Sequence, residues 1–312
     1  MATSPTIAAI VPCHNEEQAI EKVIRDLRAA VPGIHVYVYD NCSTDRTAVV
    51  AHEAGATVRR EERKGKGNVV RRAFADIDAD VYLLIDGDDT YDTAAAPKMI
   101  ETLLTGPYDQ ITGVRNQQTE SAYRAGHELG NRFFNEIVGR IFGYRVSDML
   151  SGYRVFSKRF VRSFPALSRE FEIETELTVH SINARVPQTE VSVGFRDRAV
   201  GTESKLRTYH DGLRILNMVL RLAAHERPLP TYGLLSGLVA LVGLLVGLPV
   251  IVEFAQTGLV PRFPTAILAS SLVILAVLTL IAGMLLGVLK KIRDESSRLA
   301  YLRWEAPGNG HN

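Results

Sequence analysis

Two long uncharged segments near the C-terminal end limit, more than any other feature, how this chain can fold. No charged residue occurs in 228–252 or, after a polar link at 253–262, in 263–289. A helix needs roughly 20 apolar residues to cross a bilayer, and each segment is longer than that. Two such segments in tandem predict a transmembrane hairpin with helices at about 229–252 and 264–289, whereas a single one could equally be a buried core helix.

Basic residues flank the hairpin and predict its orientation. Those that precede the first apolar segment or follow the second are Arg221, Arg227, Lys290, Lys291 and Arg293, whereas the link contains only Arg262. Lysine and arginine collect on the cytoplasmic side of a membrane. We therefore expect a multi-pass protein of the inner (cell) membrane, with both ends of the hairpin and the N-terminal domain in the cytoplasm. The apolar stretch 7–11 is too short for a secretory signal, which agrees with that placement.

The first two hundred residues alternate between strand-like and helix-like segments. Strands are expected at 6–12, 34–39, 56–60 and 81–85, and helices at 16–30, at 44–54 with Ser43 as its cap, and from the loop Lys64-Gly65-Lys66-Gly67 through 77. Such alternation favours an α/β fold, a mostly parallel sheet with helices on both faces. The chain then divides into a cytosolic domain at 1–204, a juxtamembrane amphipathic helix at 205–227, two transmembrane helices at 228–289 and a cytosolic polar tail at 290–312.

The composition narrows the classes of function. Hydrophobic residues make up 46% of the chain, which is enough for a sizeable core. A net charge of +1 gives no reason to expect a nucleic-acid partner. The two cysteines, Cys13 and Cys42, are expected to be free thiols in a reducing compartment, not a disulfide or a metal site.

Three polar clusters follow predicted strands, at 12–16, 40–45 and 86–89. In a doubly wound sheet the carboxyl ends of the strands line one crevice, so these clusters should meet there. Asp86 and Asp88 come directly after a buried strand, and their mutual repulsion is tolerated most easily with a divalent cation between them. Carboxylate oxygens with few other protein ligands suit Mg²⁺ or Mn²⁺ shared with a phosphate. A solvated turn is the alternative for these residues.

Together, in this order, the clusters resemble the cytosolic glycosyltransferases of family 2 with the GT-A fold, in which Pro-x-x-Asn-Glu, an Asp-Asp-Gly-Ser-like turn and Asp-x-Asp recur. Later segments look like motifs of the polyprenyl-phosphate glycosyltransferases, the group that includes dolichol-phosphate mannose synthase; they are Asp148 with 151–154, 171–176 and 196–206. The resemblance covers nearly the whole chain. One departure is Asp40-Asn41-Cys42-Ser43, which replaces a carboxylate and a glycine and leaves the nucleobase preference open.

The resemblance and the residue types imply several groups of site residues. Those expected to bind the donor nucleotide are Pro12, His14, Glu16, Asp40, Asn41, Lys64 and Asp86. Those expected to bind the acceptor phosphate are Arg115, Arg124, Ser151, Arg154 and Lys205. Asp86 and Asp88 would hold the metal and, with Arg115 and Arg196, serve catalysis. Glu172 and Glu174 would orient the sugar.

The reaction implied is the inverting transfer of a single sugar from a nucleoside-diphosphate donor to a polyprenyl phosphate at the cytoplasmic face of the membrane. A divalent cation and basic side chains would stabilise the charge that grows on the leaving pyrophosphate. A lipid phosphate is already an anion, so it can attack without a general base. The expected partners are therefore a nucleotide sugar, a polyprenyl phosphate and the membrane, and a homo-oligomer is compatible with this arrangement.

Other functions fit parts of the sequence. A processive or hydroxyl-acceptor polysaccharide synthase shares the fold, but its Gln-x-x-Arg-Trp motif precedes the channel, whereas Trp304 follows both apolar segments and lacks the Gln. The segment 86–90 also fits the Asp-x-Asp-x-Thr loop of phosphatases in which Asp86 would be the nucleophile. That loop normally follows the first strand of its fold, whereas this one follows two strand–helix units. A membrane-anchored nucleotide-sugar sensor is a non-enzymatic alternative.

Overall fold

A computed structural model describes residues 4–117, 147–166, 172–196 and 224–307 of the chain. The chain forms two compact units: a sheet unit of Met1–Leu206 with Ser296–Asn312, and a hairpin unit of Arg207–Glu295. Most of the juxtamembrane helix predicted at 205–227 lies outside the described residues. It remains a prediction.

The sheet unit has a sheet of seven strands in its described part, in the order β3-β2-β1-β4-β6-β5-β7. The strands are β1 (Ile7–Cys13), β2 (His35–Asp40), β3 (Thr57–Arg60), β4 (Val81–Leu84), β5 (Gln110–Gln117), β6 (Arg154–Ser157) and β7 (Gln188–Phe195). All neighbouring pairs are parallel except those of β6, which is antiparallel to β4 and β5. The mostly parallel sheet is therefore confirmed, and the first four strands lie within one residue of their predicted bounds.

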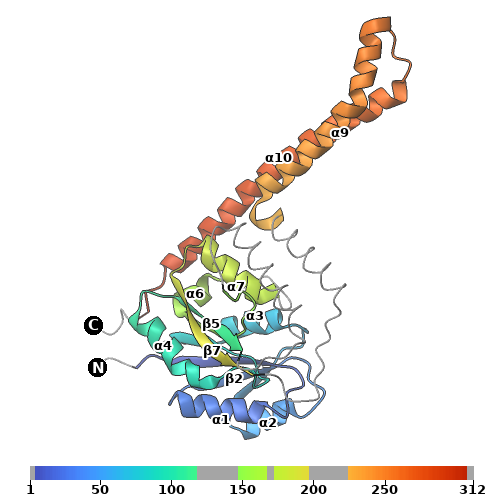
Figure 1. Cartoon of the computed structure of the whole chain (residues 1–312). Coiled ribbons are helices and arrows are strands. Elements are labelled where there is room, and N and C mark those ends of the chain that lie inside the picture. The colour runs from blue at the N-terminus through green and yellow to red at the C-terminus, as the bar shows by residue number, and fades with distance from the viewer. Residues whose placement is uncertain (1–3, 118–146, 167–171, 197–223, 308–312) are drawn as a thin grey trace. The chain divides into compact units, whose positions relative to one another are not determined.

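Helices cover both faces of the sheet, as the sequence predicted (Figure 1). They are α1 (Ile20–Ala30), α2 (Thr47–Glu53), α3 (Lys66–Asp76), α4 (Ala96–Thr105), α6 (Lys158–Ser163) and α7 (Glu172–Asn183), with a short 3₁₀ turn, η1 (Thr93–Ala95). On one face, α1 buries Ile20, Val23, Ile24 and Leu27, the one-sided spacing of an amphipathic helix. On the other face, α3, α6 and α7 contribute Phe74, Phe160 and Leu177 to a second core.

The central strand β4 is formed by the continuous apolar run of the sequence because both of its faces are covered. All four of its residues are buried. Val81 and Leu83 enter the core under α1, whereas Tyr82 and Leu84 enter the opposite core. Successive side chains of a strand point to opposite faces, so a strand covered on both faces has no polar position to offer. Each such side chain contributes roughly 1.5–3 kcal/mol through burial.

The C-terminal segment 296–307 belongs to the sheet unit. Tyr301 is 4% exposed within the core that contains Phe156 and Phe160. Its hydroxyl donates a hydrogen bond of 2.6 Å to Asp109 Oδ2, and the guanidinium groups of Arg159 and Arg298 lie over its ring, at 4.6 and 5.0 Å from the ring centre. A polar tail was predicted from 290, whereas the helix that carries the second apolar segment continues to Leu302 and delivers a core residue.

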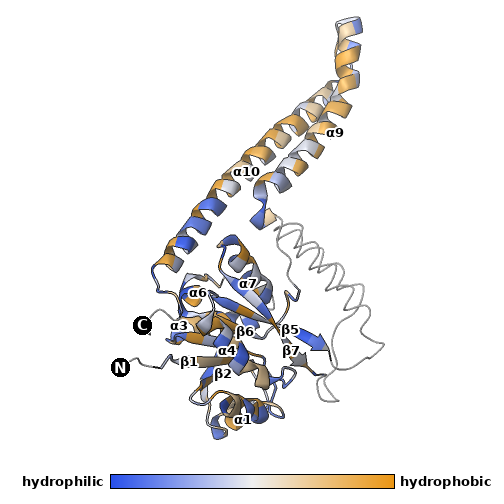
Figure 2. Ribbon diagram, turned by 60° about the vertical axis from the view of Figure 1, so that its left-hand side comes forward, coloured by the Kyte–Doolittle hydropathy of each residue, from blue (hydrophilic) through white to orange (hydrophobic). Residues whose placement is uncertain are grey.

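The hairpin unit contains α9 (Pro228–Thr257) and most of α10 (Phe263–Leu302), both long and apolar enough to cross a membrane. Only 17% and 11% of their most apolar stretches are buried, unlike a core helix of a soluble protein. Figure 2 shows the hydrophobic colouring along both helices. Ion pairs lie just beyond the apolar runs: Glu226 with Lys290 and Arg293, at 3.4 and 3.1 Å, and Glu253 with Arg262, at 3.3 Å.

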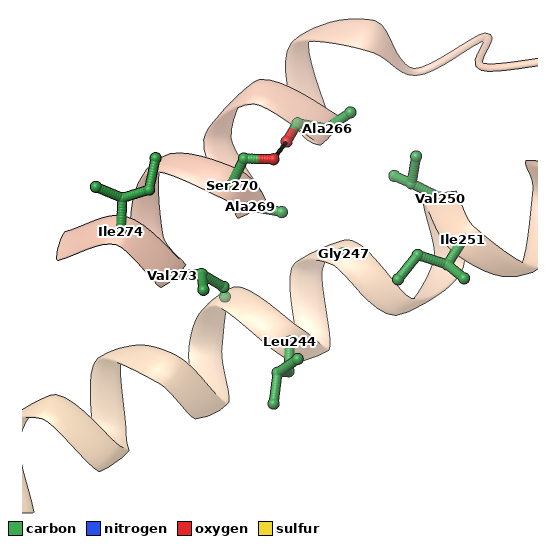
Figure 3. A pocket seen from close by; sticks show the side chains of 10 residues that line it. Leu244, Gly247, Val250, Ile251, Ala266, Ala269, Ser270, Val273 and Ile274 are labelled. Carbon is green, nitrogen blue, oxygen red and sulfur yellow. Dashed lines mark hydrogen bonds between the residues drawn. The ribbon is translucent and has the colours of Figure 1, made fainter. Parts of the chain in front are cut away.

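Glycines let the two apolar helices approach closely. A Cβ added to Gly243 would lie 3.1 Å from the Cβ of Leu272, and one added to Gly247 would lie 3.2 Å from the Cβ of Ala269. Such close contacts are typical of packed membrane helices. Beside them lies an open groove whose lining is apolar apart from Ser270, which bonds back to the carbonyl of Ala266 at 2.9 Å (Figure 3). No side chain of this lining could recognise a nucleotide, so the groove is not a donor site.

Candidate active site

The three polar clusters meet at the carboxyl edge of the sheet. Strand β1 lies between β2 and β4 and runs parallel to both. Burial raises the pKa of the Cys13 thiol well above its usual value, and four nearby carboxylates raise it further; they are Glu16, Asp86, Asp40 and Asp88. The N–H of Asn41 donates to the Cys13 carbonyl at 2.8 Å, and a Cβ added to Gly87 would lie 2.5 Å from Cys13 Sγ, so the three predicted clusters meet around the end of β1.

The loops after β1 and β2 brace each other. Asn15, at a φ of +59°, accepts a 2.8 Å hydrogen bond from the backbone N–H of Thr44, and its own N–H donates to the Ser43 hydroxyl at 3.0 Å. The N–H of Glu16 donates to the Thr47 hydroxyl at 2.8 Å. These cross-links explain why α1 and α2 begin later than predicted and why Ser43 caps no helix. His14 remains exposed and Glu16 half-buried on the resulting rim, as donor-binding residues require.

Asn41 has a structural role that the prediction of donor binding missed. It is 6% exposed, and its Nδ2 donates to the carbonyls of Glu61 and Arg63 at 2.9 and 2.8 Å. Its Oδ1 accepts from the N–H of Gly65 at 2.7 Å. An ionised Asp cannot donate these bonds, so the amide explains the departure from Asp-Asp. We correct the prediction: the Asn41 side chain holds the loop 61–65 and is not available to a nucleobase.

The other donor residues lie at the same edge. Pro12 is half-buried at the end of β1, and Lys64 is exposed. Asp40 is 5% exposed and accepts from the N–H of Ser43 at 3.2 Å, with Arg60 at 3.8 Å from its second oxygen. Asp40 is thus held in place.

The loop after β4 orients its carboxylates individually. Asp88 Oδ1 accepts from the hydroxyl and the N–H of Thr90, at 2.6 and 3.2 Å. Asp89 has a φ of +57° and accepts from Lys22 Nζ at 2.6 Å, so its carboxylate is held by α1. A Cβ on Gly87 would lie 2.5 Å from Cys13 Sγ, so only glycine fits between the carboxylates.

A buried lysine contacts the first of these carboxylates. Lys66 Nζ pairs with Asp86 Oδ1 and lies 2.7 Å from Glu174 Oε1. The Lys66 and Glu174 side chains are 7% and 5% exposed, whereas that of Asp86 is 30% exposed. Burial raises the pKa of Glu174, and Lys66 opposes that rise. Sequence reasoning selected Lys64 and gave Lys66 little weight; the signal available was its place directly after Gly65, at the start of a helix.

Arg115 and Arg196 approach the same edge from β5 and β7. Arg115 makes a bidentate pair with Asp148, at 2.6 and 2.8 Å, and its guanidinium lies 5.3 Å from the centre of the Phe195 ring. Burial lowers the pKa of Arg115, but the bond to Asp148 outweighs this and raises it overall. Arg196 is exposed, and its N–H donates to the Thr90 carbonyl at 2.8 Å. The raised pKa keeps Arg115 positively charged, and Arg196 follows the neighbouring strand β7 beside the Asp86 loop.

Ser151 and Arg154 are corrections to the predicted acceptor site. Both are fully buried. Arg154 donates to the carbonyls of Ser151 and Met149, at 2.9 and 2.6 Å, and to the Thr178 hydroxyl at 2.9 Å. Burial lowers the pKa of Arg154 to about 10. The Ser151 hydroxyl donates to the Gly113 carbonyl at 2.5 Å. These side chains hold the turn 148–153 in place and cannot reach a lipid phosphate.

Arg124, Lys205 and the side chain of Glu172 lie outside the described residues. They remain predictions.

A side chain at position 152 is expected to displace the charged groups of Asp86 and Lys66. An added Cβ would lie 2.5 Å from Asp86 Oδ2 and 2.7 Å from Lys66 Nζ. We expect Gly152→Ala to displace the Asp86 carboxylate and to lower activity about 10²-fold, the usual effect of a small misplacement of reacting groups. The test measures the transfer rate and the unfolding temperature of the same preparation. The rate should fall, and the unfolding temperature should change little. Gly233→Ala, whose Cβ meets nothing within 4 Å, is the control. A Gly152→Ala variant as active as the control would contradict this geometry.

Comparisons with known proteins agree with this arrangement. The family model described as "Glycosyl transferase family 2" matches residues 8–164. "Protein RfbJ" of Shigella flexneri is 52% identical over 128 residues, which cover 41% of this chain and 99% of that protein. "Dolichyl-phosphate hexose transferase" of Haloferax volcanii is 28% identical over 230 residues, which cover 72% of this chain and 97% of that protein.

A solved structure shows the same fold. Glucosyl-3-phosphoglycerate synthase from Mycobacterium tuberculosis, crystallised with Mn²⁺, UDP-glucose and glycerol 3-phosphate, superposes with a TM-score of 0.56 at 22% identity. The match covers 71% of this chain and 80% of that one. The predicted GT-A fold is thereby confirmed, and the phosphatase alternative does not fit it. The family model spans half of the chain, from β1 through α6, and so includes the Asp86-Gly87-Asp88 loop. This chain belongs to glycosyl transferase family 2 and is a glycosyltransferase.

Proposed function

We propose that this glycosyltransferase moves a single sugar from a nucleoside-diphosphate donor to a polyprenyl phosphate at the cytoplasmic face of the inner membrane, with inversion at the anomeric carbon. The observation that carries the proposal is the presence, in one chain, of a carboxylate-lined sheet edge and two helices apolar enough to span a membrane. The name of the Haloferax relative, a dolichyl-phosphate hexose transferase, supports a lipid phosphate as the acceptor.

The residues at the sheet edge fit a divalent cation. Asp86 and Asp88 supply hard carboxylate oxygens, and the absence of a Cβ at Gly152 gives the Asp86 carboxylate its room. Within the described ranges, no group of three or more His, Cys, Asp or Glu residues forms a protein-only metal cage. Mg²⁺ and Mn²⁺ suit such a sparse set, because they keep waters and share substrate phosphates. When bound, the cation would offset the charge of the leaving pyrophosphate.

The donor nucleoside would lie along the rim formed by the first two loops. His14 and Glu16 are accessible there, Pro12 and Asp40 lie at the strand ends, and Lys64 is an exposed cation of the neighbouring loop. Such a rim offers acceptors to ribose hydroxyls and base N–H groups. The nucleobase itself stays undetermined, since Asn41 is occupied by the loop 61–65.

Other residues would bind the sugar and the acceptor phosphate. Glu174 has one buried oxygen without a hydrogen-bond partner in the described part of the chain, and this unmet acceptor supports a role for Glu174 in orienting the sugar. Glu172, two residues earlier, would share that role. Arg115 and Arg196 would attract phosphates electrostatically, and Arg124 and Lys205 would bind the lipid phosphate. Arginine suits this role because its guanidinium holds phosphate oxygens bidentately.

The chemistry proposed is a direct displacement. An oxygen of the lipid phosphate forms a bond to the anomeric carbon on the side opposite the diphosphate. The bond between that carbon and the diphosphate breaks. The nucleoside diphosphate leaves with the electron pair, and the configuration inverts. No proton has to be removed from the acceptor, because a phosphate monoester is already an anion near neutral pH.

The test is a transfer assay on membranes that contain the protein. They receive a panel of labelled nucleotide sugars, with Mg²⁺ or Mn²⁺, and either a polyprenyl phosphate or the same polyprenol without phosphate. We expect one donor to give a single-sugar glycolipid that is labile in mild acid, only with the phosphate form, and to lose this product on chelation. Products of growing length, or transfer to the free alcohol, would favour a polysaccharide synthase. No product with any donor would contradict the proposal.

A further inference from the structure

Lys66 differs from the other cations of the site because it cannot move freely. It is the first residue of α3, and its ammonium joins Asp86, after β4, to Glu174, in the first turn of α7. The loop that precedes it is fixed, since the N–H of Gly65 donates to Asn41 Oδ1 at 2.7 Å. Gly65 has a φ of +124°, a conformation that few residues other than glycine adopt. A fixed charge therefore stands beside the proposed metal pair.

The charges around this ammonium are unbalanced without it. Asp86 and Glu174 both contact Lys66, and Asp88 follows Asp86 by two residues, so the region carries an excess of negative charge that attracts divalent cations. Lys66 offsets part of this charge, and it contacts Asp86 Oδ1 directly. Like charges repel strongly in a partly dehydrated site. The Lys66 ammonium, which contacts Asp86, therefore disfavours the binding of a free divalent cation to that carboxylate. A bound diphosphate supplies further negative charge next to the cation and is itself attracted to the ammonium, so it favours binding of the cation.

We propose that Lys66 is a positioning residue that makes metal binding depend on the nucleotide. The site then selects the complex of a divalent cation with a nucleoside diphosphate over the free cation. This inference rests on the proposed function, since it assumes that Asp86 and Asp88 hold the metal of a nucleotide-sugar donor. It assigns to Lys66 a coupling between two ligands, which is reciprocal: the cation must strengthen nucleotide binding by the same factor.

The experiment follows Mn²⁺ binding to the full-length protein in detergent by the electron paramagnetic resonance signal of free Mn²⁺, with and without UDP or GDP. In the wild type we expect weak binding of Mn²⁺ alone and stronger binding with one nucleotide, by about 5- to 150-fold, the usual range of coupling between two ligands. In Lys66→Met, Mn²⁺ alone should bind more tightly than in the wild type, and most of the enhancement by nucleotide should be lost.

Further variants separate charge from folding. Lys66→Arg keeps the charge and should keep most of the enhancement. Glu174→Gln removes one negative charge, so it should weaken the binding of Mn²⁺ alone, and this result does not depend on Lys66→Met folding. The double variant Lys66→Met with Glu174→Gln should return Mn²⁺-alone affinity toward that of the wild type. Arg72→Met removes an exposed cation of the same helix, paired with Asp76 at 2.7 Å, and should change nothing.

The outcomes distinguish the two proposals. Wild-type protein that binds no Mn²⁺ with either nucleotide would overturn the proposed function, and this inference with it. Wild-type protein that shows the enhancement, together with a Lys66→Met variant that shows the same enhancement, would overturn this inference alone. A Lys66→Met variant in which Mn²⁺ alone binds more weakly would also overturn it, because the lysine would then only support the carboxylates.

Discussion

Replacement of Asp88 by asparagine is expected to lower the transfer rate by about 10²–10³-fold, the usual loss when one group that stabilises developing charge is removed. The substitution is nearly isosteric and keeps an oxygen for the Thr90 hydroxyl, which donates to Asp88 Oδ1 at 2.6 Å. The loop should therefore stay folded while the negative charge is lost. Initial rates of glycolipid formation, with the donor selected by the panel, measure the effect.

Asp89 provides the matched control for this prediction. It follows Asp88 directly, and asparagine accepts its φ of +57°. Its carboxylate pairs with Lys22 Nζ, where the two side chains are 26% and 41% exposed. Ion pairs at such exposure contribute about 1 kcal/mol or less, so Asp89→Asn should remain within a few-fold of the wild-type rate. Equal losses in Asp88→Asn and Asp89→Asn would show that the loop, and not the charge of Asp88, is what matters.

Replacement of Tyr301 by alanine is expected to destabilise the sheet unit by about 3–5 kcal/mol, the usual result of deleting a buried aromatic ring. Tyr301 is 4% exposed, and its hydroxyl donates to Asp109, a fully buried carboxylate. For a domain of this size the loss corresponds to a fall of roughly 6–20 °C in the unfolding midpoint. Heating the full-length protein while recording far-UV circular dichroism measures it.

Two further variants test which part of Tyr301 matters. Tyr301→Phe keeps the ring, and Asp109 Oδ2 still accepts from Arg159 at 2.5 Å, so we expect a loss of about 1 kcal/mol. Trp304→Ala removes a ring that is 41% exposed and lies 5.4 Å from Lys158 Nζ, with an expected loss of about 0.5–1 kcal/mol. If Tyr301→Ala unfolded at the wild-type temperature, the segment 296–307 would not be part of the core.

The local features of this protein could be predicted because they depend on neighbours in the sequence. The continuous apolar run at 81–85 indicates a strand covered on both faces, and β4 has all its residues buried. The two uncharged segments predicted α9 and the apolar part of α10. Asp86 and Asp88 were placed at a strand end by their position after that run. The strand order was not predicted, since the antiparallel β6 depends on pairing between residues far apart in the chain.

The roles of single polar side chains depended on burial and on distant partners. Arg154 matched a motif, but it lies fully buried and bonds to carbonyl groups that surround it only in the folded chain. Asn41 matched the donor site, but it meets a loop 20 residues or more along the chain. Lys66 begins α3 after a glycine-rich loop, and only folding brings it to Asp86 and Glu174.

The amino-acid sequence was sufficient for the family, the alternation of strands and helices, the apolar hairpin and the Asp86-Gly87-Asp88 loop, because each follows from the order of residues within a short segment. Only the tertiary structure revealed the buried Lys66 beside that loop, the structural use of Ser151 and Arg154, and Tyr301 in the core. Those roles depend on contacts between residues separated by up to 192 positions, and such contacts leave no periodic pattern in the sequence.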